Sequence, residues 1–286
     1  MIRTIGILGA GQMGSGIAQL FARYGYEVTL YDIDESQLTR AAAIIREDLK
    51  RQARKGSVDA AQIAGIAGRI KPTRKPFDVG SVDFVVEAVS ESELLKLEVF
   101  RSLDETMRPG VILASNTSSI SITRIAAATR HPKRVIGMHF MNPAPLMQLV
   151  EVVRGLATSD DTFAVTSALV ASLGKEMTVS QDYPGFSVNR VLIPMINEAI
   201  FALFEGIAAA EDIDKGMKLG ANQQMGPLTL ADFIGLDTVL AICNVLYDGF
   251  KDPKYRPCPL LVRMVDAGLL GRKSGRGFYS YQQRRV

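Results

Sequence analysis

The chain has 286 residues, 47% of them hydrophobic and 22% charged, and its formal net charge is +3. This length favours two domains over a single core, and so small a net charge gives no sign of a nucleic-acid partner. The sequence has only two cysteines, no signal-peptide pattern, and no apolar run of the roughly 18 residues that a membrane helix needs, so we expect a soluble cytoplasmic protein without a membrane partner.

The first fifty residues predict a strand, a glycine-rich turn, a helix and a second strand. Residues 2–8 are apolar and strand-like, and the glycine-rich residues 9–14 follow at once. Apolar side chains then recur at helical spacing as far as Gly25, which is typical of a helix end. Residues 26–31 predict the second strand, and Asp32 follows it directly. This order of elements is typical of a dinucleotide-binding unit.

In such a unit each of the three glycines has a physical task. Gly9 permits the tight turn, Gly11 lets the backbone approach a pyrophosphate, and Gly14 lets the helix pack close to the strand. The start of the helix offers free N–H groups to a phosphate. We therefore predict that this turn, including Gln12 and Met13, binds the cofactor.

Asp32 is placed to select that cofactor. It lies about 20 residues beyond the turn, which is the offset expected for an acid that binds a ribose hydroxyl. A carboxylate at this point would repel a 2′-phosphate, so we expect NAD rather than NADP. The motif alone leaves a flavin dinucleotide open as the alternative.

Two helices are predicted next, over residues 36–55 and 60–70, as an insertion between strands. The first of them ends in a cluster of four basic side chains: Lys50, Arg51, Arg54 and Lys55. Such a cluster is either a solvated face or a clamp for an anionic part of a ligand, and the pattern alone leaves both interpretations open.

The following segments alternate between short apolar strands and helices. Strands are predicted over residues 82–88, 111–114, 135–138, 149–153 and 176–180. Helices are predicted over residues 91–107 and 160–173. This alternation predicts a doubly wound, Rossmann-type parallel sheet, in which ligands bind outside the carboxyl ends of the strands. Ser118 and His139 both follow predicted strands, so we expect both at that edge.

One of the two histidines is a candidate general base. His131 lies in a polar loop, whereas His139 lies at the end of an apolar strand, as either a base or a core histidine. Glu151 lies inside another apolar strand and should have a partner, because an unpaired buried charge is costly. A histidine paired with it would be held in one orientation and one tautomer.

Strand signals nearly vanish in the last third of the chain. Residues 1–182 are therefore predicted to be the NAD-binding domain, and residues 183–286 an all-helical domain that binds substrate and dimerises. Its helices are expected over residues 188–205, 210–219, 228–247 and 260–267. The wide apolar face of the first helix suggests a homodimer. Asn189 is a polar position on that helix, near the domain junction, where substrate sites often form.

Several segments in combination resemble the short-chain (S)-3-hydroxyacyl-CoA dehydrogenases, and most closely the bacterial 3-hydroxybutyryl-CoA dehydrogenases. The segments are residues 115–119, 137–143, 149–152 and 184–190, and residues 193–198, 210–219 and 271–279 extend the likeness over essentially the whole chain. The resemblance implies hydride transfer between NAD and C3 of a short-chain (S)-3-hydroxyacyl-CoA, such as 3-hydroxybutyryl-CoA to acetoacetyl-CoA, reversibly and without a metal.

The resemblance also implies roles for individual residues. His139 becomes the general base and Glu151 its orienting partner, while Ser118 and Asn189 hydrogen-bond the reacting oxygen of the substrate. Further cofactor contacts fall on Glu91, Lys96, Asn116, Ser118, Asn142 and Lys273. Arg51 and Lys55 fall where relatives bind the phosphates of coenzyme A, which favours the clamp over the solvated face.

One departure from the family pattern is visible. Gln223 and Gln224 precede Met225 where relatives often have His-Pro, which leaves the acyl-chain preference open. Two other functions compete with this interpretation. A dehydrogenase of free β-hydroxyacids usually depends on a lysine in the helical domain, and none lies between Asn189 and Glu205. A protein that only senses the NADH ratio would not need both His139 and Glu151.

Overall fold

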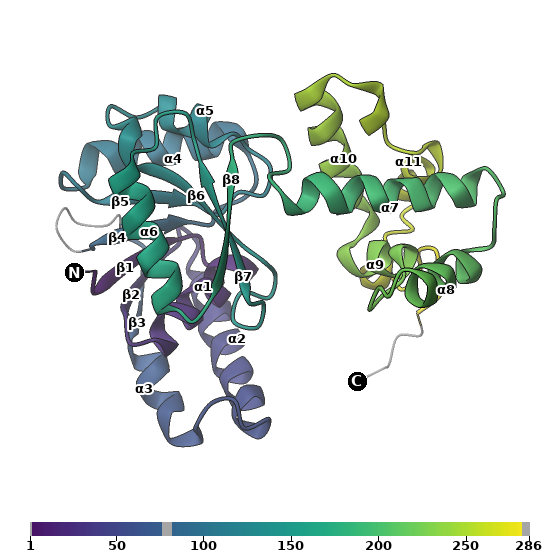
Figure 1. Cartoon of the computed structure of the whole chain (residues 1–286). Helices are drawn as coiled ribbons and strands as arrows, with labels where there is room; N and C mark the ends of the chain where they lie inside the picture. The colour runs from purple at the N-terminus through teal and green to yellow at the C-terminus, as the bar shows by residue number, and fades with distance from the viewer. Residues whose placement is uncertain (1, 76–81, 282–286) are drawn as a thin grey trace. The chain divides into compact units, whose positions relative to one another are not determined.

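The computed structural model describes residues 2–75 and 82–281, and the chain divides into two compact units, Met1–Asp182 and Tyr183–Val286. The first unit is built on a sheet of eight described strands with helices on both faces (Figure 1). The strands are β1 (Thr4–Leu8), β2 (Glu27–Tyr31), β3 (Ile70–Thr73), β4 (Phe84–Glu87), β5 (Ile112–Ser115), β6 (Val135–Phe140), β7 (Leu149–Arg154) and β8 (Glu176–Gln181). The helices are α1 (Gln12–Arg23), α2 (Glu35–Arg54), α3 (Ile63–Gly68), α4 (Glu93–Thr106), α5 (Ile122–Ala127) and α6 (Asp160–Ser172).

The predicted doubly wound sheet is confirmed. The strand order is β3-β2-β1-β4-β5-β6-β7-β8, so the winding direction reverses between β1 and β4. Ligands of such sheets bind in the crevice outside the carboxyl ends of the strands, next to this reversal. The elements that carry the glycine turn, Asp32 and the segment after β5 therefore all end at one edge of the sheet.

The prediction of a parallel sheet is wrong for one pair, because β6 and β7 run antiparallel. They are joined by residues 141–148, a stretch too short for the crossover of a dozen or more residues that parallel neighbours require. Strand β6 also extends to Phe140, so His139 lies inside the strand and not after it. The antiparallel register sets His139 opposite Glu151.

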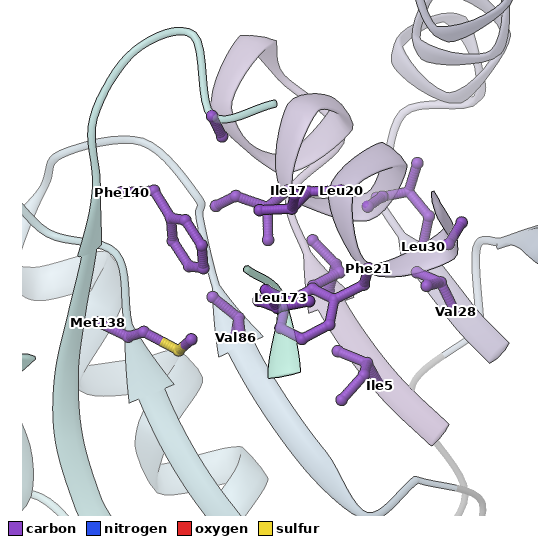
Figure 2. Packing of buried hydrophobic residues seen from close by; sticks show 14 of the residues in the cluster. Ile5, Ile17, Leu20, Phe21, Val28, Leu30, Val86, Met138, Phe140 and Leu173 are labelled. Carbon is purple, nitrogen blue, oxygen red and sulfur yellow. The ribbon is translucent and has the colours of Figure 1, made fainter. Parts of the chain in front are cut away.

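A close-packed core attaches the first helix to the sheet. Ile17, Leu20 and Phe21 recur on one face of α1 and are at most 1% exposed. Figure 2 shows them pointing toward sheet residues that include Val86 and Phe140. Burial of each such side chain stabilises the fold by about 1.5–3 kcal/mol, so α1 and its N-terminal turn are held firmly on the sheet.

Two local predictions in the first unit need correction. The helix expected over residues 60–70 is a short 3₁₀ turn, Ala60–Gln62, followed by α3, and the chain then forms β3 parallel to β2. Strand β3 is a partly exposed edge strand containing Pro72, so it lacks the apolar alternation that would have predicted it. Helix α5 was not predicted either. Its N-cap is Ser121, whose hydroxyl oxygen accepts the Arg124 N–H.

The second unit is helical, as expected. Its described helices are α7 (Val188–Phe204), α8 (Ala210–Gly220), α9 (Pro227–Ile234), α10 (Leu236–Phe250) and α11 (Pro259–Asp266). The single helix predicted over residues 228–247 is two helices, because Gly235 has φ +101° and the chain bends by 98° there. Among the described residues, no single helix is long and apolar enough to span a membrane, and only the bent pair α9–α10 has the length and composition.

Candidate active site

The glycine turn between β1 and α1 has the shape that a dinucleotide needs. A Cβ on Gly14 would lie 1.8 Å from the Gly9 carbonyl oxygen, so α1 can approach β1 this closely only with glycine there. Gly9 has φ +95°, which favours glycine, whereas a Cβ on Gly11 would meet nothing within 4 Å. The first turn of α1 carries no acidic side chain and no side-chain cap. Its N–H groups and the open space at Gly11 therefore fit a bound pyrophosphate.

Asp32 is tied to the same turn. Its Oδ2 accepts the backbone N–H of Ala10 at 2.7 Å, and its Oδ1 accepts the N–H of Asp34 at 3.0 Å. These two bonds fix the carboxylate at the end of β2, directly beside the glycine turn. Each carboxylate oxygen has a further lone pair for a ribose hydroxyl. The residues present thus fit the adenosine half of NAD.

The antiparallel pair β6–β7 brings His139 and Glu151 together. The Nδ1 atom of His139 lies 2.8 Å from Oε2 of Glu151. The Glu151 side chain is fully buried, and that of His139 is 11% exposed. A hydrogen bond from Nδ1–H to a buried carboxylate fixes the tautomer and leaves the basic lone pair of the neutral ring on Nε2.

The turn after β5 carries Ser118 and is organised by Glu91. One carboxylate oxygen of Glu91 accepts the hydroxyl of Thr117 at 2.6 Å, the N–H of Ser118 at 2.9 Å and the hydroxyl of Ser119 at 3.0 Å. The Ser118 hydroxyl also donates to this oxygen, at 3.2 Å. Burial alone would raise the pKa of Glu91, but the charge of Lys96 and these hydrogen bonds outweigh it and lower that pKa.

Asn116 and Asn142 fix the loops that follow β5 and β6. The side-chain oxygen of Asn116 accepts the Phe140 N–H at 2.9 Å, which ties the Ser118 turn to β6. The side-chain oxygen of Asn142 accepts from the Gln12 amide at 3.3 Å, so the loop after β6 reaches the first turn of α1. Both asparagines thus lie in segments next to the predicted cofactor site.

A buried carboxylate that the sequence analysis missed lies next to the turn that carries Ser118. Glu87, at the end of β4, is fully buried and accepts from Lys96 at 2.5 Å, from the Ser115 hydroxyl at 2.6 Å and from the Val89 N–H at 2.7 Å. Burial raises its pKa, against the charge of Lys96. A glutamate inside an apolar strand was the available signal, the same one that drew attention to Glu151.

Lys96 is itself only 1% exposed. Its ammonium also donates to the Val89 carbonyl oxygen at 3.4 Å and lies 3.5 Å from Oε2 of Glu91. Lys96 therefore pairs with both Glu87 and Glu91, the carboxylates that hold the segment carrying Ser118.

The basic cluster of α2 borders a cavity of about 450 Å³ in the first unit. Arg51 and Arg54 line it, together with side chains of α1 and residues 142–145. Arg51 also forms an ion pair with Asp48. Lys55 is exposed at the C-cap of α2, one helical turn beyond Arg51.

Two further predicted site residues belong to the second unit. Asn189 is the second residue of α7. Lys273 lies in the short 3₁₀ turn Arg272–Ser274 and forms an ion pair with Asp237 of α10.

A doubly wound sheet with a glycine turn, an acid after β2 and a buried His–Glu pair defines a dinucleotide-dependent dehydrogenase. Residues 4–183 match the family model for the NAD binding domain of 3-hydroxyacyl-CoA dehydrogenase, and residues 185–281 match its C-terminal domain. The chain therefore belongs to the 3-hydroxyacyl-CoA dehydrogenase family, as predicted, and is an NAD-dependent oxidoreductase.

Individual relatives agree with the family models over the full length. The chain is 52% identical to the 3-hydroxybutyryl-CoA dehydrogenase of Bradyrhizobium diazoefficiens over 282 residues, 99% of this chain and 96% of that protein. It is 51% identical to a probable 3-hydroxybutyryl-CoA dehydrogenase of Bacillus subtilis, with 99% of each chain covered. The crystal structure of (S)-3-hydroxybutyryl-CoA dehydrogenase from Ralstonia eutropha matches with a TM-score of 0.96 and 50% identity, over 99% of this chain and 100% of that chain.

Proposed function

We propose that the protein interconverts (S)-3-hydroxybutyryl-CoA and acetoacetyl-CoA with NAD. The observation that carries this proposal is the buried pair of His139 and Glu151, joined at 2.8 Å in two adjacent strands. The relatives named for this reaction support the four-carbon acyl group. When bound, NAD supplies the hydride acceptor at C4 of its nicotinamide ring.

His139 is the general base in this proposal. Its Nε2 takes the proton of the 3-hydroxyl group as the hydride leaves C3, and the C3–O bond becomes a carbonyl. In the reverse direction the imidazolium returns that proton to the carbonyl oxygen. A positioned base of this kind typically contributes about 100- to 10,000-fold to the rate.

Glu151 serves as the orienting partner of His139. Because its carboxylate accepts from Nδ1–H, it holds the ring with Nε2 as the basic nitrogen and stabilises the imidazolium that forms. Ser118 is assigned to the reacting oxygen because its turn lies at the same edge of the sheet as the carboxyl end of β6, which carries His139. Asn189 receives the same role on the family resemblance of residues 184–190 alone.

Arg51 and Lys55 are assigned to the phosphates of coenzyme A. The support is the cavity beside α2, since a guanidinium there can bind a phosphate with two parallel hydrogen bonds. Asp48, which pairs with Arg51, would have to share that side chain with the ligand.

We also propose that the protein is a cytoplasmic homodimer. The helical unit exposes large apolar side chains, including Val191 at 71%, Ile207 at 73% and Leu219 at 78%. Such side chains are typical of surfaces that pack against a second copy. The two free cysteines, both buried, are compatible with a reducing compartment. Sedimentation that gives only monomer at micromolar concentration would remove the dimer.

One spectrophotometric assay tests the proposed reaction. The purified chain is mixed with NADH and acetoacetyl-CoA, and loss of NADH absorbance is expected. Free acetoacetate in a parallel cuvette should give no comparable rate. Turnover of the free acid would favour a β-hydroxyacid dehydrogenase, and binding of NADH without turnover of either substrate would favour a sensor.

A further inference from the structure

The connection between β6 and β7 (residues 141–148, hereafter the β6–β7 connection) is held by one lysine from a distant part of the sequence. The Lys175 ammonium donates to the carbonyl oxygens of Ala144 at 3.0 Å, Pro145 at 3.5 Å and Met147 at 2.6 Å. An ammonium has three protons, so this single side chain can satisfy all three carbonyl groups. Lys175 is thus the central polar contact of the connection.

The connection has few means of fixing its own shape. Pro143 and Pro145 have no N–H to donate, and its turn depends on the Pro143 carbonyl oxygen, which accepts from Leu146 and Met147 at 3.0 and 3.1 Å. The remaining restraint comes from outside. Ala144 is only 3% exposed and packs near Gly16 of α1.

Lys175 is well placed to supply this restraint because its own backbone is fixed. The residue directly precedes β8, and the next residue, Glu176, donates its N–H to the Gln148 carbonyl oxygen at 2.9 Å. The parallel pairing of β7 and β8 begins at that point, with Leu149 opposite Glu176. Partial burial lowers the pKa of Lys175, and the charge of Arg23 lowers it further.

The restrained segment forms one wall of the cavity beside α2. Asn142, Pro143, Ala144 and Pro145 line that wall, and Arg51 is among the side chains that complete the cavity. The pair of His139 and Glu151, by contrast, lies within the paired residues of β6 and β7, which Lys175 does not contact. A change in the connection should therefore alter binding more than proton transfer.

We propose that Lys175 is a positioning residue for the acyl-CoA: by holding three carbonyl groups of the β6–β7 connection, it keeps the wall formed by residues 142–145 in the geometry that binds this ligand. The identity of the ligand rests on the proposed function. The restraint itself is inferred from the contacts of Lys175 and does not depend on which ligand binds.

The substitution Lys175→Met tests the proposal, because it keeps the length of the side chain and removes its three donors. The KM for acetoacetyl-CoA should rise about tenfold, since a wall that is no longer preorganised weakens binding, while kcat stays within about twofold. Lys175→Arg should lie in between, because its planar fork cannot point at three converging oxygens. Lys71→Met is the matched control, since Lys71 is exposed on β3 and pairs only loosely with Glu27, and it should change neither constant.

Three measurements decide the outcome. A lower melting temperature with unchanged KM would show a merely structural role and overturn the proposal, as would a fall in kcat at constant KM. Should Lys175→Met fail to fold, Lys175→Gln, which keeps two donors, takes its place with the same expected direction. Binding of coenzyme A itself, measured by calorimetry, separates this inference from the proposed function. If the wild type binds coenzyme A but turns over no acetoacetyl-CoA, the function fails while weaker binding by the variant still supports the role of Lys175.

Discussion

His139 and Glu151 occupy opposing positions in the antiparallel ladder of β6 and β7, and their side chains meet at 2.8 Å. This relationship depends on register, because a slip of one residue would turn the Glu151 side chain to the other face of the sheet. The short β6–β7 connection therefore contributes to catalysis indirectly. It forces the antiparallel pairing that puts a base and its orienting acid side by side.

His139→Gln is expected to abolish turnover while leaving the cofactor site intact. Glutamine can still hydrogen-bond Glu151, but it cannot take a proton, so the rate of NADH oxidation by acetoacetyl-CoA should fall at least about 100-fold. NADH binding, followed by its fluorescence, should stay close to the wild-type value because the glycine turn and Asp32 are untouched. Near-normal turnover would remove His139 from the mechanism.

Asp32→Ala is expected to weaken NAD binding and to relax discrimination against NADP. The substitution removes the carboxylate that repels a 2′-phosphate and the bond to the Ala10 N–H at 2.7 Å, which holds the glycine turn. The ratio of kcat/KM with NADH to that with NADPH is the measurement. An unaltered ratio would contradict the ribose contact, and Asp34→Ala, two residues further on and exposed, is the control.

Much of this architecture is predictable because it depends on local patterns. The glycine turn, the apolar strands and the sudden loss of strand signals near residue 183 follow from spacing and composition. Glu151 stood out because a charge inside an apolar strand needs a partner. The contact with His139 itself, however, follows from pairing between strands, which no single segment encodes.

Other features depend on tertiary context that a single sequence hides. Strand β3 is recognisable only by its pairing with β2, since its residues are partly exposed and do not alternate. The antiparallel pairing of β6 and β7 could have been predicted from the length of the connection between them. The role of Lys175 could not, because its three partners are about thirty residues away in the chain and are backbone groups of any residue type.

Asp104→Asn is expected to destabilise the first unit in a pH-dependent way. Burial alone would raise the pKa of Asp104, but bonds from the Arg134 guanidinium, the Arg130 N–H and His131 lower it overall. The stability it contributes is therefore present above the unfolded-state pKa of ~3.9 and is lost as pH falls through the lower folded-state pKa. Removing one partner of a buried pair costs about 3–5 kcal/mol. Urea unfolding of both proteins should show this difference at neutral pH and a smaller one in acid, and an equal difference at every pH would contradict it.

Arg51→Ala is expected to raise the KM for acetoacetyl-CoA with little change in kcat, because a phosphate remote from C3 contributes equally to the ground state and the transition state. The effect should exceed that of Lys55→Ala, since Arg51 lines the cavity and Lys55 lies at the exposed end of α2. Arg40→Ala, exposed on the same helix, is the matched control for the loss of one positive charge. If Arg51 and Arg40 behave alike, the basic cluster is a solvated face. If only Arg51 and Lys55 raise KM, and a thioester without the nucleotide part of coenzyme A shows no such effect, the cluster binds the phosphates.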